Sequence, residues 1–280
     1  MRHNMNSFKP HLLILAILVL IAGCLNITTA ATSNTIQISS AGTIIYIAPL
    51  RHIDFETGDF NESINANWGG TIIQPGLVGN YAASFVAPPT ADMGLWSWDP
   101  VNQYHQMYYD CLVKFTAGMS IPTWQMIFEI NAPYPASGNE HVALLLGNRD
   151  GVTNNVFLQF YSNYDYRGYD LPYTWGLAPM GSGSDRVYEL HSGVSMPTGQ
   201  TVRIEVYVKT DLVNGIITVK MNGVEIINYQ GRTQFDPEWN PDSPTPQYSD
   251  LISTVWGNYC DATLPVHEMI LDEIYIGGSS

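Results

Sequence analysis

The stretch "GIITVKMNGVEIINY", Gly215–Tyr229, decides the fold class of this protein. It holds two runs in which apolar and polar residues alternate, and a period of two indicates a half-buried β-strand. Between the runs, Asn222 and Gly223 supply the two positive-φ positions that a type I′ turn requires. The stretch therefore predicts a tight antiparallel β-hairpin.

The same pattern continues on both sides of this hairpin. Short runs of β-branched and aromatic residues, such as "TIIYIA", "TWQMIFEIN" and "HEMILDEIYIGG", are separated by clusters of Gly, Pro, Asn and Asp. Almost nothing has the period of a long amphipathic helix. Many strands without helices to cover a parallel sheet predict an all-β protein, a two-sheet antiparallel jelly-roll sandwich.

Three segments resemble one protein family in their order and spacing. They are an opening "DFETGDF" followed by a Trp, a block "VRIEVYV" with "NGIITVKMNGVEI", and a closing "LDEIYIGG". Over Thr43–Gly278 the chain resembles the concanavalin A-like, laminin G-like jelly-roll domains. The resemblance implies this fold, with the last strand near the first, and it implies little about activity.

The N-terminus has the pattern of an export signal. In residues 1–23, basic residues precede an unbroken apolar run that is too short to span a bilayer comfortably. The run ends in "IAGC", which resembles the lipobox of prokaryotic lipoproteins and implies that Cys24 is lipidated. The alternative is an ordinary secretory cleavage, for instance after "TTAA", that discards Cys24. Either way we expect an extracellular or cell-surface protein, which the lipobox would attach to a membrane only through its N-terminus.

Composition divides the rest of the chain and restricts its partners. Residues 24–42 are rich in Ser, Thr, Asn and Ala, and this composition predicts a flexible stalk. Residues 43–280 are predicted to form the jelly-roll domain. The formal charge of −14 argues against nucleic acid as a partner and favours neutral glycans, cations or proteins. In an exported domain Cys111 and Cys260 are candidates for a disulfide, the alternative being two buried thiols.

Most familiar catalytic patterns are missing from the sequence. It has no G-x-S-x-G, H-E-x-x-H, C-x-x-C or P-loop, and no strand with the E-x-D-x-x-E spacing of jelly-roll glycoside hydrolases. Glu129 and Glu205 are single acids with apolar neighbours. "YVKTDLVNG", from Tyr207, partly resembles a late strand of alginate lyases, but the companion strands of that family are missing. We therefore predict no catalytic residue.

Aromatic residues in three segments instead indicate a binding site. Aromatic rings stack on the C–H faces of sugars, and nearby Asp, Asn and Arg groups hydrogen-bond the hydroxyls, so this mixture suits a glycan. The alternative is that the loop tyrosines only cover an irregular edge of the sandwich. The candidate carbohydrate-binding residues are Trp96 and Trp98 in "MGLWSWDP", Tyr164, Tyr166, Tyr169, Tyr173 and Trp175 in a Tyr-rich segment, and Trp239 in a Pro-rich segment.

Acidic residues near the two ends of the domain form a candidate metal site. If "RHIDFETGDF" is a strand, Asp54 and Glu56 lie on one face of it. A last strand beside it would bring Asp272 close, and carboxylates suit a structural Ca²⁺. The alternatives are an exposed strand face or an ion pair with Arg51.

These observations together predict a surface-anchored or secreted, lectin-like domain that binds a glycan or polysaccharide without catalysis. Two alternatives stay open: a polysaccharide lyase or glycoside hydrolase of the jelly-roll type, and an adhesive or structural surface protein that binds another protein.

Overall fold

The computed structural model describes most of the predicted domain. The chain divides into two compact units, residues 1–34 and 35–280, and every described residue belongs to the second. No helix that is long and apolar enough to span a membrane occurs among the described residues. The described residues are 36–40, 43–62, 66–87, 94–98, 104–131, 141–162, 186–211, 214–231, 233, 253–257, 260–261 and 263–279.

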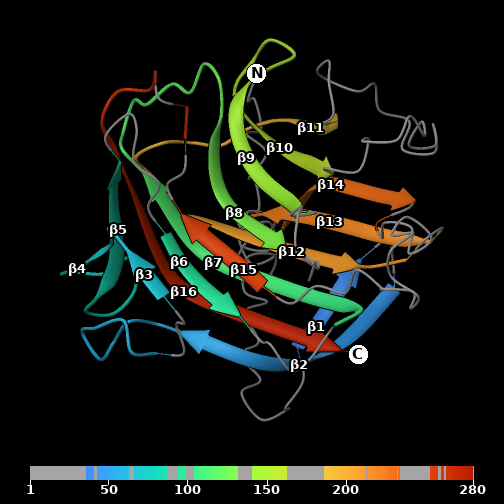
Figure 1. The fold of residues 1–280 in the computed structure, drawn as a ribbon, viewed down its shortest axis with the longest axis horizontal. Coiled ribbons are helices and arrows are strands. Elements are labelled where there is room, and N and C mark those ends of the chain that lie inside the picture. The colour runs from blue at the N-terminus through green and yellow to red at the C-terminus, as the bar shows by residue number, and fades with distance from the viewer. Residues whose placement is uncertain are drawn as a thin grey trace, which may run out of the picture. The chain divides into compact units, whose positions relative to one another are not determined.

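Two antiparallel sheets make up this unit, which confirms the predicted all-β jelly-roll sandwich (Figure 1). The large sheet has the order β1(Ile36–Ser40), β2(Thr43–Ile53), β16(His267–Ser279), β7(Gln106–Phe115), β12(Val202–Lys209), β13(Gly215–Met221), β14(Val224–Gly231), and β5(Ala82–Ala87) joins β4(Thr71–Ile73) to β16. The small sheet has the order β11(Arg186–Ser195), β10(Val152–Ser162), β9(His141–Arg149), β8(Gln125–Asn131), β15(Ser253–Gly257), β6(Gly94–Trp98), β3(Ala66–Trp68).

The hairpin predicted over residues 215–229 is formed by β13 and β14. Met221 pairs with Val224, and the two residues between them have φ angles of 51° (Asn222) and 78° (Gly223). Both values lie in the left-handed region that a type I′ turn needs. The predicted turn is confirmed.

The first and last long strands lie side by side, as the resemblance implied. β16 pairs antiparallel with β2, with Ile274 opposite Ile53, and on its other side it pairs with β7. The two ends of the domain are therefore held in one sheet by backbone hydrogen bonds.

The domain begins earlier than the sequence predicted. Residues 36–40, which we assigned to the stalk, form β1 and pair with β2, Ile36 opposite Ile47. Ile36 also packs against a small apolar cluster that contains Ile47 and Tyr207. The alternation in "IQI" has the period of two that a strand requires.

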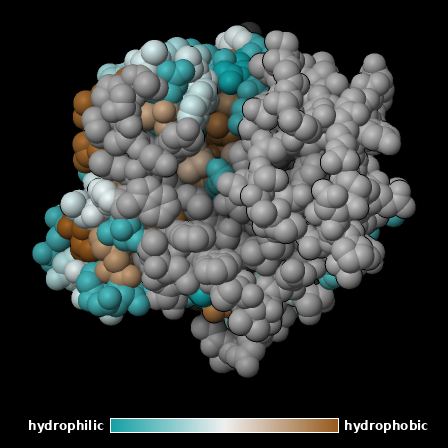
Figure 2. Space-filling view, in the orientation of Figure 1, coloured by the Kyte–Doolittle hydropathy of each residue, from teal (hydrophilic) through white to brown (hydrophobic). Residues whose placement is uncertain are grey.

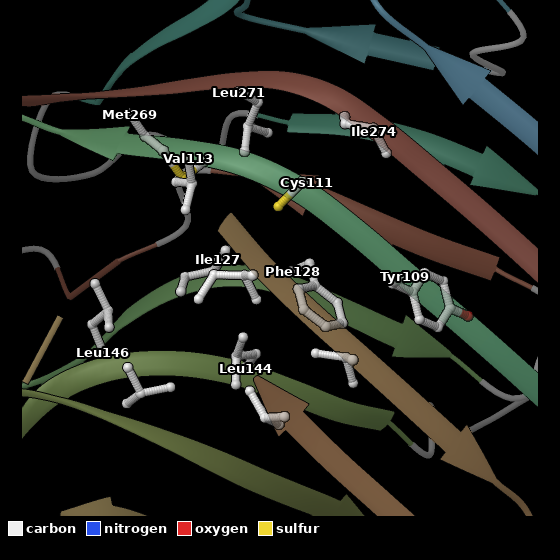
Figure 3. Close-up of a cluster of buried hydrophobic side chains, with 14 of the residues drawn as sticks. Tyr109, Cys111, Val113, Ile127, Phe128, Leu144, Leu146, Met269, Leu271 and Ile274 are labelled. Carbon is white, nitrogen blue, oxygen red and sulfur yellow. The ribbon is translucent and has the colours of Figure 1, made fainter. Parts of the chain in front are cut away.

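The core lies between the two sheets (Figure 3). Tyr109, Cys111 and Val113 of β7 face the core from the large sheet, and Phe128 of β8 and Leu144 of β9 face it from the small sheet. Burial of such side chains stabilises the sandwich by roughly 1.5–3 kcal/mol each. Large exposed hydrophobic residues are few among the described residues, and the brown patches in Figure 2 are small.

Cys111 and Cys260, which the sequence allows to pair, are both buried free thiols in the structure. Cys111 projects from β7, whereas Cys260 bridges to Gln125 of the small sheet. Facing sheets pack about 10 Å apart, whereas the Cα atoms of a disulfide are about 4.4–6.8 Å apart. A bond would therefore require the sheets to approach locally.

Candidate functional site

One edge of the small sheet brings together the strand ends that flank the aromatic segments. Across this edge the register runs from Trp98 of β6 through β15, β8 and β9 to Tyr161 of β10. Trp98 is the last residue of β6, and Ser253, which pairs with it, is the first residue of β15. We call this row of strand ends the aromatic edge. In full it consists of Trp98, Ser253, Asn131, His141, Tyr161 and Val187.

The predicted aromatic segments are joined to the aromatic edge by the chain itself. In the sequence, the segment 163–185 connects β10 to β11, and the segment 234–252 leads into β15 at Ser253. Sequence alone does not predict that the strand ends flanking these segments lie in one row, because this follows from strand order. The residues Tyr164, Tyr166, Tyr169, Tyr173, Trp175 and Trp239 lie outside the described residues.

A second row, one step inside the edge, carries polar groups on the face of the small sheet that points away from the core. Here Glu129 of β8 pairs with Ala143 of β9, which pairs with Gln159 of β10. Gln159 in turn pairs with Glu189 of β11, and Trp96 of β6 belongs to the same row through β15. Glu129, Ala143 and Gln159 therefore lie in one row of the sheet. This row also contains the position of Trp96 and is next to the row that contains Trp98.

An ion-pair network fixes the far end of this row. Arg149 donates from Nε and Nη2 to the two carboxylate oxygens of Glu189, at 2.7 and 3.1 Å. The side chain of Glu189 is only 4% exposed. His191, two residues on, contacts Glu189 at 2.9 Å and Asp150 at 2.7 Å. Burial raises the pKa of Glu189, but hydrogen bonds from Arg149 and His191 lower it by more, so the net shift is downward.

This network was not among the predictions from the sequence. The sequence pattern that indicates part of it is "YELH", in which Glu189 and His191 are two residues apart and therefore lie on one face of a strand. Arg149 lies in the turn region of another hairpin, and only the strand order brings it to them.

An apolar patch lies beside the network on the same face. Ala143, Leu145 and Phe157 are buried and pack with Trp124, apart from the main core. The guanidinium carbon of Arg149 lies 4.5 Å from the centre of the Phe157 ring. The guanidinium is thus held by a carboxylate, a ring and the carbonyl oxygen of Thr123, at 2.8 Å.

Tyr207, which carries the partial lyase resemblance, lies on the large sheet instead. It is 2% exposed, and its hydroxyl donates to Oε1 of Gln106 at 2.8 Å. Burial raises its pKa to about 12. A buried, hydrogen-bonded phenol of this kind is poorly placed to move a substrate proton.

The acids predicted to hold a metal do not form one strand face. β2 ends at Ile53, and Phe55 has a positive φ of 61°, so Asp54 and Glu56 lie in the loop that follows. Glu56 accepts hydrogen bonds from the backbone of Asn80 and Tyr81, at 2.7 and 3.1 Å.

Asp272, the third predicted ligand, is occupied in a similar way. Its Oδ2 accepts hydrogen bonds from the backbone of Leu77 and Val78, both at 2.9 Å. Burial raises the pKa of Asp272 to about 6, although the N–H groups of Val78 and Glu273 oppose the shift. Glu56 and Asp272 thus hold the loop between β4 and β5, and no group of three or more His, Cys, Asp or Glu among the described residues is placed to hold a metal ion. Calcium binding stays a prediction.

Comparisons with known proteins support the fold. No family model and no curated protein matches the chain. Among solved structures, it is similar to an endo-β-1,4-glucuronan lyase from the fungus Trichoderma reesei, at 12% identity and a TM-score of 0.57, over 83% of this chain and 96% of the other. It is also similar to an alginate lyase from Chlorella virus, at 10% identity and a TM-score of 0.56, over 83% and 100% of the two chains.

A further alginate lyase, from Aplysia kurodai, matches at 10% identity and a TM-score of 0.50, over 77% of this chain and 90% of the other. At such identities the likeness shows the fold alone. The fold is a two-sheet antiparallel jelly-roll sandwich.

Proposed function

We propose that this protein is a carbohydrate-binding domain that binds a glycan at the aromatic edge, with Trp96, Trp98 and the two attached aromatic segments as its binding surface. The observation that carries the proposal is the register that joins these separate parts of the sequence at one edge of the small sheet.

The chemistry of this edge suits a sugar. Tryptophan and tyrosine rings offer flat apolar surfaces to the C–H faces of a pyranose, and both side chain types also carry a polar group that can form hydrogen bonds. Glu129 and Gln159, in the adjacent row, carry a carboxylate and a carboxamide, groups that can bind hydroxyls, although Nε2 of Gln159 also donates to Oε1 of Glu189 at 3.5 Å. The charge of −14 favours a neutral glycan over a polyanionic one.

Binding without turnover fits the described side chains better than catalysis. A polysaccharide lyase needs a group that neutralises the substrate's carboxylate, beside a base that removes a proton. Arg149, a cation on this face, already binds Glu189 through two hydrogen bonds. An enzyme is the second candidate because the similar structures include lyases that act on glucuronan and alginate.

A glycan array separates the candidates when each hit is then incubated with the protein and examined for new reducing ends and unsaturated products. We expect binding and no product. New products would replace the binding function by the enzyme, and an array without any hit would favour a protein partner.

We also infer that the protein is exported and attached to the cell surface through Cys24. This proposal rests on the sequence "IAGC" after an apolar run. In native cells, a radiolabelled fatty acid should be incorporated into the wild type and not into Cys24→Ala. Equal incorporation into both would refute the anchor.

A further inference from the structure

A strip of polar side chains crosses the face of the large sheet that points away from the core. It runs in register over six neighbouring strands, β2, β16, β7, β12, β13 and β14, each contributing one residue. We call it the polar strip, and it consists of His52, Tyr275, Asp110, Glu205, Lys220 and Glu225. It lies on the other sheet from the aromatic edge.

The centre of the polar strip is a built network around Asp110. Arg203, which lies two residues before Glu205 on β12, donates from Nε to both carboxylate oxygens of Asp110, at 2.9 and 3.1 Å, and Nη2 also donates to Oδ2. The hydroxyl of Tyr108 donates to Oε1 of Glu205 at 3.0 Å and lies 3.4 Å from Oδ2 of Asp110. One connected set of hydrogen bonds therefore links four side chains.

Packing holds this network in place. Tyr108 is 7% exposed and belongs to an apolar cluster with Ile47 and Tyr207 on the same face of the sheet. Because its ring is packed by the first strands of the domain, its hydroxyl is fixed toward Glu205. Side chains that are fixed before a ligand arrives lose little entropy when it binds.

The network leaves a donor and an acceptor unused within the described part of the chain. Nη1 of Arg203 and Oε2 of Glu205 make no hydrogen bond to any described residue. The Arg203 side chain is 53% exposed, so its guanidinium is open to solvent, whereas the Asp110 side chain beneath it is only 5% exposed. A ligand that both accepts and donates hydrogen bonds would complete the set.

A surface ion pair alone does not account for this arrangement. Exposed pairs contribute little to stability, and burying a carboxylate carries a desolvation cost that one pair repays only with good geometry. Burial indeed raises the pKa of Asp110, against the opposing hydrogen bonds from Arg203. Ionisable groups whose pKa values are shifted by burial and by a specific charged partner are enriched at functional sites.

We propose that the polar strip is a second saccharide-binding site, in which neighbouring hydroxyls of a neutral glycan accept from Nη1 of Arg203 and donate to Oε2 of Glu205. Hydroxyls suit this pair of groups because each one is both donor and acceptor. Tyr275, next to Asp110 in the strip, stacks on His52 with ring centres 3.9 Å apart, and both rings hydrogen-bond Oε2 of Glu273 at 3.0 Å, so a fixed pair of aromatic rings lies beside the hydroxyl-binding groups.

Two sites on different sheets would make the protein bivalent. A polysaccharide chain, or two neighbouring chains, could then be held by both sites, which raises the overall affinity above that of either site.

The test uses calorimetry of the full chain with neutral hexasaccharides, namely cellohexaose, xylohexaose, mannohexaose and maltohexaose. Trp98→Ala is the background because it weakens the proposed edge site and leaves the polar strip intact. In that background we expect at least one hexasaccharide still to bind. In the double variant Trp98→Ala, Glu205→Gln, the dissociation constant of that hexasaccharide should be at least about tenfold higher than in Trp98→Ala, as expected for a lost hydrogen bond to a charged group.

Two further variants serve as a second test of the site and as a control. Arg203→Lys keeps the charge but loses the guanidinium fork, and we expect it to weaken binding like Glu205→Gln. Lys114→Gln, on the same sheet face but outside the strip, should leave binding unchanged. Thermal melts check that each variant is folded, and Glu205→Gln is the decisive one because Gln can still accept from Tyr108.

The outcomes separate this inference from the proposed function. No binding in the Trp98→Ala background, or equal binding with and without Glu205→Gln, would overturn the second site. If Glu205→Gln weakens binding while Trp98→Ala alone does not, the second site stands and the proposed function at the aromatic edge fails.

Discussion

The guanidinium of Arg149 and the carboxylate of Glu189 form a two-point ion pair that ties β9 to β11, an edge strand of the small sheet. β10 lies between these two strands, so the pair spans it. The side chains are 17% and 4% exposed, respectively. The pair therefore holds β11, the strand that follows the segment 163–185 in the sequence, on the sheet.

Breaking this pair should be strongly destabilising. Arg149→Met leaves the Glu189 carboxylate buried without its main partner, and we expect the free energy of unfolding to fall by about 3 kcal/mol. Urea denaturation measures the loss. As a control, Lys114→Met removes a cation from the other sheet and should cost less than about 0.5 kcal/mol. Equal losses in the two variants would contradict the structural role of the pair.

The same pair predicts a pH dependence. Because the pKa of Glu189 is lowered in the folded state, its contribution to stability is present above the unfolded pKa of about 4.3 and is lost as the pH falls through the folded value. Glu189→Gln should therefore differ most from the wild type near neutral pH, and the difference should shrink in acid. Urea midpoints measured across this range check the prediction, and a constant difference would refute it.

Glu56 should control the order of the loop between β4 and β5. Hydrogen bonds from the Asn80 side chain and from the Tyr81 and Asn80 backbones lower its pKa, so the carboxylate is the form that holds the loop. In Glu56→Ala we expect faster amide exchange at Asn80 and Tyr81, measured by NMR, with the amides of β13 unchanged. In the wild type, the protection of these two amides relative to their intrinsic exchange at each pH should fall in acid, as the carboxylate protonates. Unchanged exchange at both amides would show that other contacts order the loop.

The turn at Asn222 and Gly223 should be sensitive to side-chain bulk. Gly223 has a φ of 78°, and a residue with a Cβ pays about 1–2 kcal/mol in this region. Gly223→Val should lower the free energy of unfolding by at least that amount. The neighbouring Val224 is 65% exposed, and Val224→Thr should have little effect. Thermal denaturation of both variants checks this, and a neutral Gly223→Val would contradict the turn type.

The fold could be predicted from sequence because its determinants are local. The alternation in residues 215–229 and the Asn222-Gly223 pair specify a hairpin without reference to the rest of the chain. The start of the domain was predicted too late in the sequence. Residues 36–40 lie in a segment rich in Ser and Thr, which was assigned to the stalk, and the alternation of Ile36 and Ile38 in it is short. Their strand, β1, is identified in the structure by its pairing with β2.

The sites could not be predicted in the same way. Arg149 and Glu189 are far apart in sequence and meet because β9, β10 and β11 are neighbours. Asp54 and Glu56 seemed to share a strand face, but β2 ends before them, and they accept backbone hydrogen bonds. Strand order and strand ends are long-range properties, so sequence suggested the residue types of a site and not their grouping.

The central claim is tested most directly by the affinity of a neutral glycan identified on the array for three proteins: the wild type, Trp98→Ala and Tyr46→Ala. Tyr46 is the matched control, an aromatic residue that is 63% exposed and lies on β2 of the other sheet. The account predicts that Trp98→Ala raises the dissociation constant at least about tenfold, or about 1.4 kcal/mol, and that Tyr46→Ala does not change it. Equal affinities of Trp98→Ala and the wild type would contradict glycan binding at this edge.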